Sequence, residues 1–307
     1  MTSFKCGGMT LGFSWAHVLG DAFSLSQYLN LLGQIMIAPD HQPPTNSLPT
    51  LLPKLAETNK ANKPNNPSSL LVEPLSVKWV EPVGDHWITA NNCTMENYSF
   101  HITAQQLKAM SSKMSFKIPL FESLSAIFWQ CLTRIRKGSE EPKTVTIICR
   151  NREKKGGSST YLISNYNQTI STVQVDFSVT EADPKELAAM IMEQKKVDEK
   201  SKIEEMVKQD QGMSDLIIYG ANLTFVDLGE ADLYGFELKK QKPAFVNYTI
   251  DGVGDEGVIL VMKGPPSGKV NDDDGDIGDE GRTVTVILPK NQIMMLKDEL
   301  RSEWSIA

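Results

Sequence analysis

Apolar side chains recur at steps of three and four residues directly after Asp21, as at Ala22, Leu25 and Leu29. This spacing puts them on one face of a helix, so we expect a helix that begins near Asp21 and ends before Pro39. The same periodicity predicts further helices, one of which is apolar over most of its surface and is therefore expected to be buried. These helices are expected over residues 104–113, 121–136 (the buried one), 184–206 and 293–300.

Other segments carry the patterns of β-strands. Residues 4–16 are rich in glycine and other small side chains, and we expect them to form a strand that ends at His17. Further strands are predicted by alternating or short apolar runs bounded by turn residues. They are expected over residues 98–103, 145–149, 169–177, 217–226, 244–251, 258–263 and 283–288. Because strands often follow strands, the order predicts an α/β fold with a mixed sheet.

One long stretch of the chain lacks any such periodicity. Residues 39–69 are rich in Pro, Asn, Ser and Lys, which predicts a surface segment with little capacity for burial. Residues 70–95 carry Trp79 and Trp87 and are expected to be an extended connector. We therefore place a domain boundary in this connector, since 307 residues are enough for two domains.

Charge and cysteine usage exclude several classes of protein. The net charge of −7 argues against a nucleic-acid-binding protein, which would need a basic face. No apolar run reaches the roughly 18 residues that span a bilayer, and the first residues lack the pattern of a signal peptide. Four widely spaced cysteines predict reduced thiols in a cytosolic protein, and the five glycosylation sequons are then accidental.

The segment that carries the clearest chemistry is His17-Val-Leu-Gly-Asp21. An imidazole that is held in place near the end of an apolar, glycine-rich segment can remove a proton from a hydroxyl or an amine. A carboxylate four residues later can support the same site or cap the helix that follows. Both roles of Asp21 remain open at this point.

Three other features favour ordinary structural roles. Residues 156–159 form a Gly-Gly-Ser-Ser turn without the lysine or the following helix of a phosphate loop. The acidic run at 272–276 does not fit the spacing of a calcium loop, so we expect a solvated hairpin. His41, His86 and His101 have no carboxylate or cysteine at metal-ligand spacing, and we expect no metal site.

The segment from Cys6 to Asp21 resembles the His-x-x-x-Asp region of the plant BAHD acyltransferases, which are CoA-thioester-dependent transferases. The resemblance extends along the whole chain. Residues 121–131 look like the helix at the start of that family's second domain, and residues 223–243 look like the frame around its second signature. Within the family, the run His17 to Ser24 is similar to the eceriferum branch, which is linked to very-long-chain acyl groups for leaf-surface wax.

The resemblance implies a chloramphenicol-acetyltransferase-like α/β fold of two domains with mixed sheets, of which the first is incomplete here. Residues 1–75 would be the C-terminal part of the first domain, with the His-x-x-x-Asp motif. Residues 76–95 would be the interdomain linker and residues 96–307 the second domain. In the family, the active site is a channel between the two domains.

The resemblance also assigns roles at the site. His17 would be the general base, a role that typically contributes about 10²–10⁴-fold in rate. Asp21 would be structural support and would pair with an arginine of the second domain, for which Arg150 and Arg152 are the candidates. No cofactor would be bound, and acyl-CoA would be a co-substrate.

The second signature departs from the family pattern. The family has Asp-Phe-Gly-Trp-Gly before Lys-Pro, and all five positions differ here. Two glycines that permit unusual backbone angles are lost, and two lysines stand nearby instead. These lysines predict either a solvated hairpin or a cationic patch that binds a partner or a CoA phosphate. The five residues are Glu237, Leu238, Lys239, Lys240 and Gln241.

Family members also carry a substantial stretch before the His motif, whereas sixteen residues precede His17 here, which predicts an N-terminally truncated chain. Our first hypothesis is an eceriferum-type protein that assists an elongase condensing enzyme in very-long-chain fatty-acid elongation for cuticular wax. The alternatives are an active acyl-CoA-dependent O- or N-acyltransferase and a truncated product with neither function. We expect a cytoplasmic monomer, with the cytosolic face of the endoplasmic reticulum as a second location.

Overall fold

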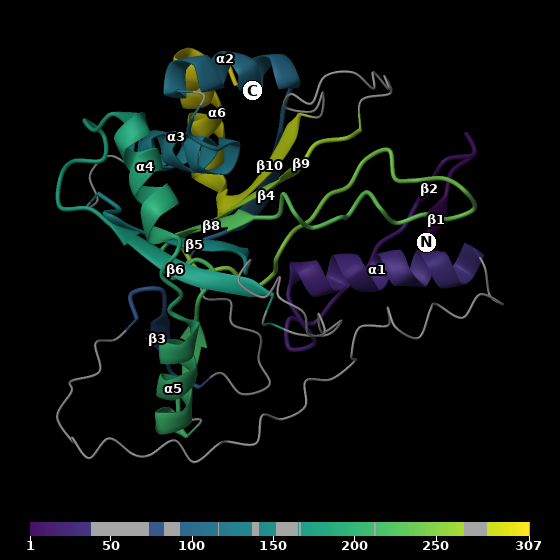
Figure 1. The fold of residues 1–307 in the computed structure, drawn as a ribbon, viewed down its shortest axis with the longest axis horizontal. Coiled ribbons are helices and arrows are strands. Elements are labelled where there is room, and N and C mark those ends of the chain that lie inside the picture. Colours follow the sequence, from purple (N-terminus) through teal and green to yellow (C-terminus); the bar gives the residue numbers. More distant parts are fainter. Residues whose placement is uncertain are drawn as a thin grey trace.

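A computed structural model of the chain describes residues 1–37, 74–82, 93–115, 117–136, 141–151, 165, 167–211, 213–266 and 281–306. Its centre is a six-stranded sheet (Figure 1). The strands lie in the order β4 (Met95–Ile102), β10 (Arg282–Pro289), β9 (Val258–Lys263), β8 (Leu223–Asp227), β5 (Thr144–Arg150) and β6 (Gln168–Gln174).

The sheet is mixed, as the order of strands and helices along the sequence predicts. The central strands β5, β8 and β9 run parallel to one another, and the outer pairs β4–β10, β10–β9 and β5–β6 are antiparallel. The parallel strands are apolar and buried on both faces, which is typical of parallel pairs covered by other layers. The α/β fold class is confirmed.

One face of the sheet is covered by helices (Figure 1). The helix α3 is buried along almost its whole length and packs beside α4 and α6. Its Trp129 is fully buried, and the indole nitrogen donates a 2.7 Å hydrogen bond to the carbonyl of Pro142. These helices are α2 (Ala104–Met114), α3 (Leu120–Ile135), α4 (Pro184–Gln194) and α6 (Lys290–Trp304).

The opposite face carries a smaller apolar cluster, to which the helices α1 (Ala22–Ile37) and α5 (Lys200–Asp210) each contribute a residue. Phe23 and Ile203 pack there with sheet residues such as Ile148 and Val226. Two small two-stranded sheets lie outside the central one. They are β1 (Thr2–Ser3) with β2 (Met9–Thr10), and β3 (Lys78–Val80) with β7 (Asp215–Ile217).

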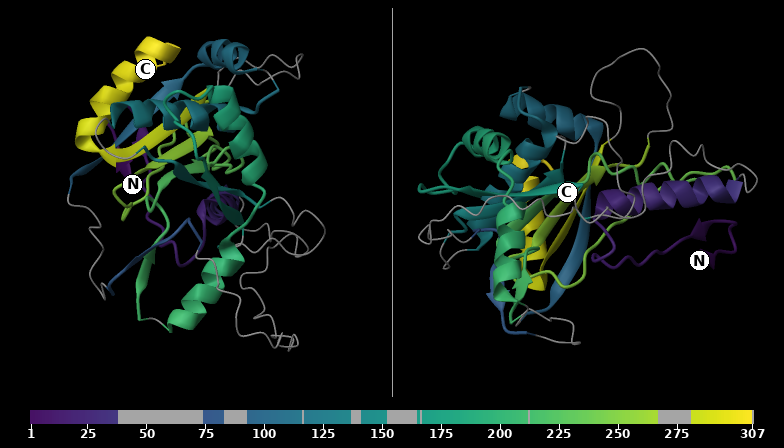
Figure 2. Two further views of the ribbon diagram at one scale, coloured as in Figure 1. Left: turned by 90° about the vertical axis from the view of Figure 1, so that its left-hand side faces the viewer. Right: turned by 60° about the horizontal axis from the view of Figure 1, so that its bottom comes forward.

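The helix α1 extends away from the sheet, and the segment between β8 and β9 runs along it (Figures 1 and 2). Leu25, Leu29 and Phe236 form a third apolar cluster between the two. A Cβ atom at Gly33 would lie 2.8 Å from the carbonyl oxygen of Glu237, so the helix and this segment touch through their backbones. The N-terminal helix is thereby joined to residues that follow β8.

Two predicted strands are wrong. Within residues 4–16 only Met9–Thr10 form a strand, paired with Thr2–Ser3, and most of this stretch is exposed. Residues 244–251 form no strand and instead follow α1 as extended chain. Outside Met9–Thr10, both stretches lack a partner strand among the described residues to accept their backbone hydrogen bonds.

Two other elements are divided. The helix predicted over 184–206 is split into α4 and α5. In the break between them, the carboxylate of Asp198 accepts hydrogen bonds from the backbone N–H groups of Lys200 (3.2 Å) and Ile170 (3.0 Å). The strand predicted over 217–226 is interrupted by a turn at Gly220, with φ of +84°, which separates β7 from β8.

The remaining predicted helices and strands are confirmed to within a few residues at their ends. The predicted connector 76–95 contains the short strand β3. The stretches 39–69, 156–159 and 272–276 lie outside the described residues, and the domain limits at 75 and 95 stay a prediction. No helix in the described part of the chain is long and apolar enough to cross a bilayer.

Candidate active site

His17 lies in a tight turn directly before α1. The N–H of Gly20 donates to the carbonyl of His17 (3.2 Å), and the N–H of Leu19 donates to the carbonyl of Ala16 (2.9 Å). The indole N–H of Trp15 closes the turn with a 2.8 Å hydrogen bond to the carbonyl of Gly20. The side chain of His17 therefore projects from a turn rather than from the end of a strand.

The side chain of Asp21 holds this turn in place. One carboxylate oxygen accepts the backbone N–H of Ser24 at 2.9 Å, which is the geometry of a helix cap at the start of α1. The other oxygen accepts the backbone N–H of Asn167 at 3.0 Å, one residue before β6. The capping role that the sequence left open is thus present, and the same carboxylate also joins α1 to the edge of the central sheet.

The carboxylate of Asp21 is buried, and burial raises its pKa above the ordinary value, against the lowering effect of the hydrogen bonds from Ser24 and Asn167. A third contact closes the junction, since the amide of Asn167 donates to the hydroxyl of Ser24 at 3.0 Å. Asp21 therefore acts as internal structure and does not face the solvent around His17.

The imidazole of His17 contacts a tyrosine. Its Nε2 atom lies 3.1 Å from the hydroxyl of Tyr219, with the two ring centroids 5.4 Å apart. The same hydroxyl donates to the side-chain oxygen of Gln168 at 3.3 Å. The amide of Asn165 donates to the backbone carbonyl of His17 at 2.9 Å. The histidine is thus held by residues from around β6 and from the turn before β8.

These contacts could not be predicted from the sequence. Asn165, Gln168 and Tyr219 lie about 150 to 200 positions from His17, and none belongs to a motif with fixed spacing. The one local hint is the polar run from Asn165 to Gln168 just before an apolar strand. Only the pairing of β6 within the sheet brings that run to the His17 turn.

The predicted arginine partner of Asp21 is not Arg150. The guanidinium of Arg150 pairs with the carboxylate of Glu230 at 3.5 Å and lies over the ring of Phe23, 5.7 Å from its centroid. Arg152, the other candidate, lies outside the described residues, so its pairing with Asp21 stays a prediction. Within the described residues, the backbone N–H groups of Ser24 and Asn167 bind the carboxylate of Asp21.

The altered second signature forms a hairpin turn. Leu238 and Gln241 exchange both backbone hydrogen bonds, at 2.9 and 3.0 Å, and the two residues between them have positive φ. Lys239 has φ of +51° and Lys240 has φ of +64°. This is the two-residue turn in which glycine and asparagine are favoured, so two lysines hold a backbone that is strained for residues with a Cβ atom.

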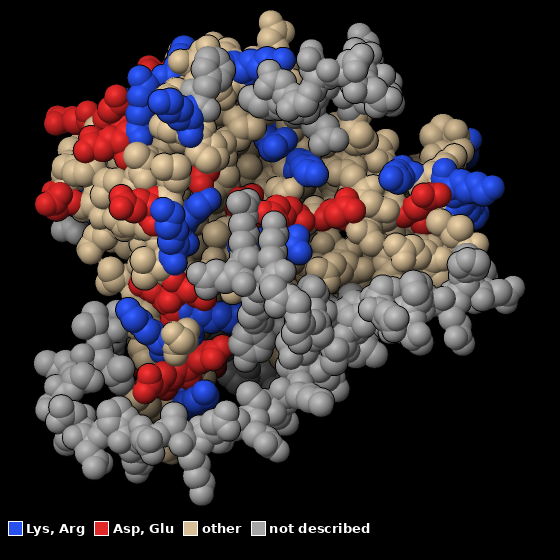
Figure 3. Space-filling view, in the orientation of Figure 1, with Lys and Arg blue, Asp and Glu red and all other residues tan. Residues whose placement is uncertain are grey.

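The side chains of this turn are exposed, as expected of a solvated hairpin. Basic side chains gather at the end of the molecule where the segment turns back, whereas both signs are interspersed over the rest of the visible face (Figure 3). Lys242 is exposed beside Lys239 and Lys240. A cationic role for this turn stays a prediction.

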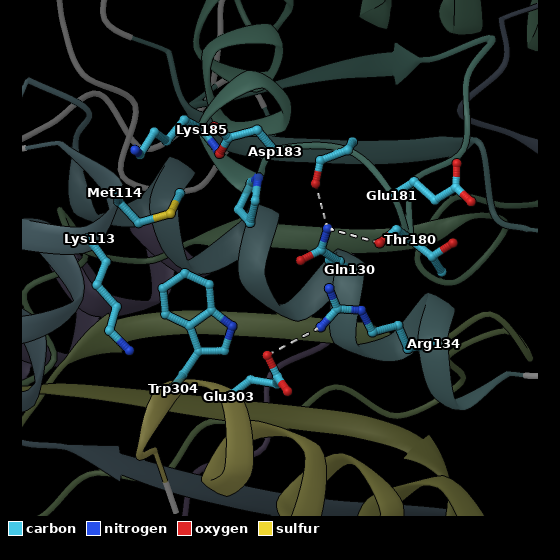
Figure 4. A pocket seen from close by; sticks show the side chains of 12 residues that line it. Lys113, Met114, Gln130, Arg134, Thr180, Glu181, Asp183, Lys185, Glu303 and Trp304 are labelled. Atoms are coloured by element: carbon cyan, nitrogen blue, oxygen red, sulfur yellow. Dashed lines mark hydrogen bonds and ion pairs between the residues drawn. The ribbon is translucent and has the colours of Figure 1, made fainter.

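Two clefts lie away from His17. The smaller, of about 360 Å³, is lined by residues of α2, α3, α4 and α6 (Figure 4). Two of its polar side chains have partners, since Gln130 donates to the carbonyls of Val179 and Ala182, and Arg134 pairs with Glu303. The larger, of about 1090 Å³, contains the ion pair of Arg136 with Glu256. Neither includes the motif residues.

Among the described residues no group of His, Cys, Asp and Glu side chains is placed to hold a metal ion. His101 lies on β4 and is exposed, whereas His41 and His86 lie outside the described residues. All four cysteines are free thiols, of which Cys131 is buried and has a pKa raised to about 12 by that burial.

Comparison with curated proteins shows what the chain is similar to. A family model described as the Transferase family matches residues 1–302. The chain is 37% identical to Protein ECERIFERUM 26-like of Arabidopsis thaliana, over 98% of this chain and 63% of that protein. It is 36% identical to Protein ECERIFERUM 26 of Arabidopsis thaliana, over 100% of this chain and 65% of that protein. The chain therefore spans just under two thirds of the length of these relatives.

Solved structures share the fold. Vinorine synthase superposes with a TM-score of 0.59 at 15% identity, over 92% of this chain and 60% of that one. TRI101 of F. graminearum, in complex with coenzyme A and deoxynivalenol, superposes with a TM-score of 0.59 at 14% identity, over 94% of this chain and 64% of that one. The expected acyltransferase-type fold is confirmed by these superpositions.

Replacing Asp21 by alanine is expected to destabilise the protein by about 2 kcal/mol, because two buried N–H groups lose their acceptor. A carboxyl whose pKa is raised by folding contributes most stability below its unfolded pKa, and this contribution is lost as the pH rises through the folded value. The cost of Asp21→Ala should therefore be larger at pH 4 than at pH 7 in urea unfolding. The exposed Asp251→Ala is the control, and an equal cost at both pH values would contradict the buried carboxyl.

Replacing Lys240 by glycine is expected to stabilise the protein by about 1 kcal/mol, because glycine adopts the positive φ at this position without a Cβ clash. Lys240→Ala is the matched control, since it removes the same charge but keeps the Cβ atom, and it should leave stability nearly unchanged. Both variants are compared by urea unfolding. Equal stabilisation by the two would assign the effect to charge and not to the backbone of the turn.

Proposed function

Since this chain belongs to the Transferase family, the BAHD acyltransferases, we propose that it is an eceriferum-type protein that acts in very-long-chain fatty-acid elongation for cuticular wax. In this proposal it assists an elongase condensing enzyme and does not itself transfer an acyl group. The single observation that carries the proposal is the replacement of the second signature by the turn from Leu238 to Gln241, while the frame around His17 is kept.

The turn from Leu238 to Gln241 matters because its segment packs against α1. Its segment packs on α1 through the backbone contact of Gly33 with Glu237 and through Phe236. The helix α1 begins at Asp21 and thus directly after the His17 turn. The two motif regions are therefore mechanically connected here through α1.

The environment of His17 also favours a role without catalysis. The imidazole is exposed, and its Nε2 atom is occupied by the hydroxyl of Tyr219. Acyl transfer from a thioester benefits from a site that excludes water, since water competes with the acceptor for the acyl group. An exposed histidine is therefore a poor general base for this reaction while water has free access to it.

An accessory protein needs a surface for its partner, and α1 offers one. Its last turn presents an apolar face to solvent, made by Ile35, Met36 and Ile37, which are 44% to 53% accessible, and Tyr28 is 38% accessible two turns earlier. Neighbouring apolar side chains at this level of exposure are characteristic of surfaces that bind other proteins. We place the contact with the condensing enzyme on this face of α1.

Co-expression in yeast with a plant condensing enzyme tests the proposal. The chain should lengthen the acyl products of that enzyme, and His17→Ala should leave the lengthening intact, because no proton transfer by His17 is involved. The double variant Ile35→Glu, Met36→Glu should abolish it, because charge enters the proposed contact face. The readout is the chain-length profile of the fatty acids by gas chromatography.

The matched control is Met294→Glu, Met295→Glu on α6, which places the same two charges at similarly exposed apolar positions far from α1. It should behave like the unaltered chain. Loss of lengthening in His17→Ala would contradict the accessory role, and loss in both double variants would contradict the placement on α1.

A second candidate function is acyl-CoA-dependent transfer to an alcohol or amine, with His17 as general base. It is favoured by one observation, namely that the turn of His17 is still fixed by Asp21, Asn165 and Trp15. The fold is shared with TRI101 of F. graminearum, whose structure holds coenzyme A, so acyl-CoA is the proposed co-substrate. Release of free CoA by the purified chain, with a sharp fall in His17→Ala, would decide for this candidate.

A further inference from the structure

Tyr219 is the residue that meets His17 most directly, and its hydroxyl has two neighbours. The Nε2 atom of His17 lies 3.1 Å from the oxygen, and the side-chain oxygen of Gln168 lies 3.3 Å from it on another side. The hydroxyl carries a single hydrogen, which can serve only one of them. An amide oxygen accepts and never donates, so the hydrogen of Tyr219 points to Gln168. The imidazole must then donate from Nε2 to the phenol oxygen.

We propose that Tyr219 and Gln168 are positioning residues that fix His17 as the tautomer with its proton on Nε2, leaving Nδ1 as the ring nitrogen that meets a substrate proton. This inference deepens the second candidate function, because it names the nitrogen that would act as the base. It also explains why, in the first candidate function, the Nε2 atom of His17 is unavailable to accept a proton. The tautomer itself is a property of the free protein and needs neither function to be correct.

The phenol keeps its hydrogen under ordinary conditions. Burial raises the pKa of Tyr219 well above its usual range, and the nearby Tyr248 and Asp21 raise it further. A phenolate, which has no hydrogen to donate to Gln168, is thereby disfavoured. The hydroxyl of Tyr219 therefore donates one hydrogen bond and accepts one, as the proposed arrangement with Gln168 and His17 requires.

Both positioning residues are held rigidly. Gln168 is 6% accessible and lies at the start of β6, paired with Arg150 of β5. Tyr219 precedes Gly220, where a Cβ atom would lie 2.5 Å from the backbone of Gly254. The carbonyl of Tyr219 also accepts the N–H of Gly254 at 2.9 Å. The phenol therefore has little freedom to turn away from the imidazole.

The other ring nitrogen is accessible. Within the described part of the chain, Nδ1 of His17 has no hydrogen-bond partner, and the side chain is exposed. The backbone of His17 is anchored separately by the amide of Asn165, so the ring does not depend on Nδ1 for its position. A hydroxyl or amine that approaches from solvent would meet Nδ1 first.

The opposite amide orientation of Gln168 makes the opposite prediction. If its NH₂ group faced Tyr219, the phenol would accept from Gln168 and donate to Nε2, and the proton of His17 would lie on Nδ1. The two arrangements use the same heavy atoms and differ only in where the hydrogens lie. They are therefore separated by an experiment that reads the protonation of each ring nitrogen.

Nitrogen-15 NMR of the imidazole, recorded at a pH where histidine is neutral, provides that experiment. The signals of His17 are assigned by their loss in His17→Gln. We expect Nε2 at the chemical shift of a protonated nitrogen and Nδ1 at that of an unprotonated one. A proton on Nδ1 in the unaltered protein would overturn the proposal.

Two variants test the roles of the neighbours. Gln168→Met removes the acceptor of the phenol hydrogen, so Tyr219 should donate to Nε2 and the proton of His17 should move to Nδ1. Tyr219→Phe should leave the proton on Nε2 but expose it to water. The proton NMR signal of that Nε2–H group should then be lost by exchange with water. An unchanged spectrum in both variants would contradict the proposal, since a purely structural role would leave the tautomer unmoved. Should Gln168→Met fail to fold, the tautomer of the unaltered protein still decides.

The experiment uses no acyl-CoA and no condensing enzyme. A failure of the tautomer prediction therefore leaves the two candidate functions untouched, and a failure of either function leaves the tautomer result standing.

Discussion

The carboxylate of Asp21 is the interaction on which the rest of the candidate site depends. One of its oxygens begins α1 by accepting the N–H of Ser24, and the other holds the N–H of Asn167 at the edge of the sheet. This carboxylate is buried, and burial raises its pKa. The His17 turn, the helix and the sheet edge thereby become one unit, although 146 positions separate Asp21 from Asn167 in the sequence.

The same helix carries the constraint to the second family motif. Gly33 of α1 lies against the backbone of Glu237, and the turn that follows places Lys239 and Lys240 in a strained conformation at the surface. The helix is thus fixed at its start by one motif and packed along its length by the other. The two regions that resemble the family's motifs are therefore in direct contact with the same helix.

Periodicity in the sequence was sufficient for elements whose neighbours bury one clear face. The helix α3 and the strands β9 and β10 follow directly from their apolar patterns, and Asp21 as a helix cap follows from its place before α1. Residues 244–251 have an extended pattern but no partner strand in the described part of the chain, and within residues 4–16 only Met9–Thr10 find one, which no local pattern reveals.

The polar side chains around His17 were unpredictable for a related reason. Tyr219 reaches the imidazole only because a glycine turn separates β7 from β8, and Asn167 reaches Asp21 only because β6 pairs with β5. Such contacts depend on the pairing of strands far apart in the sequence. Arg150 was a reasonable partner for Asp21 by its place at a strand end, but Glu230 is nearer and carries the charge that it needs.

Amide hydrogen exchange at Ser24 and Asn167 tests most directly whether Asp21 holds this unit together. In the unaltered protein both amides should exchange slowly, at rates like those of the paired amides of β6, because both are bound to one buried carboxylate. In Asp21→Ala both should lose protection together, while the amides of α3 keep theirs. Continued slow exchange at either position in that variant would contradict the central role of the carboxylate.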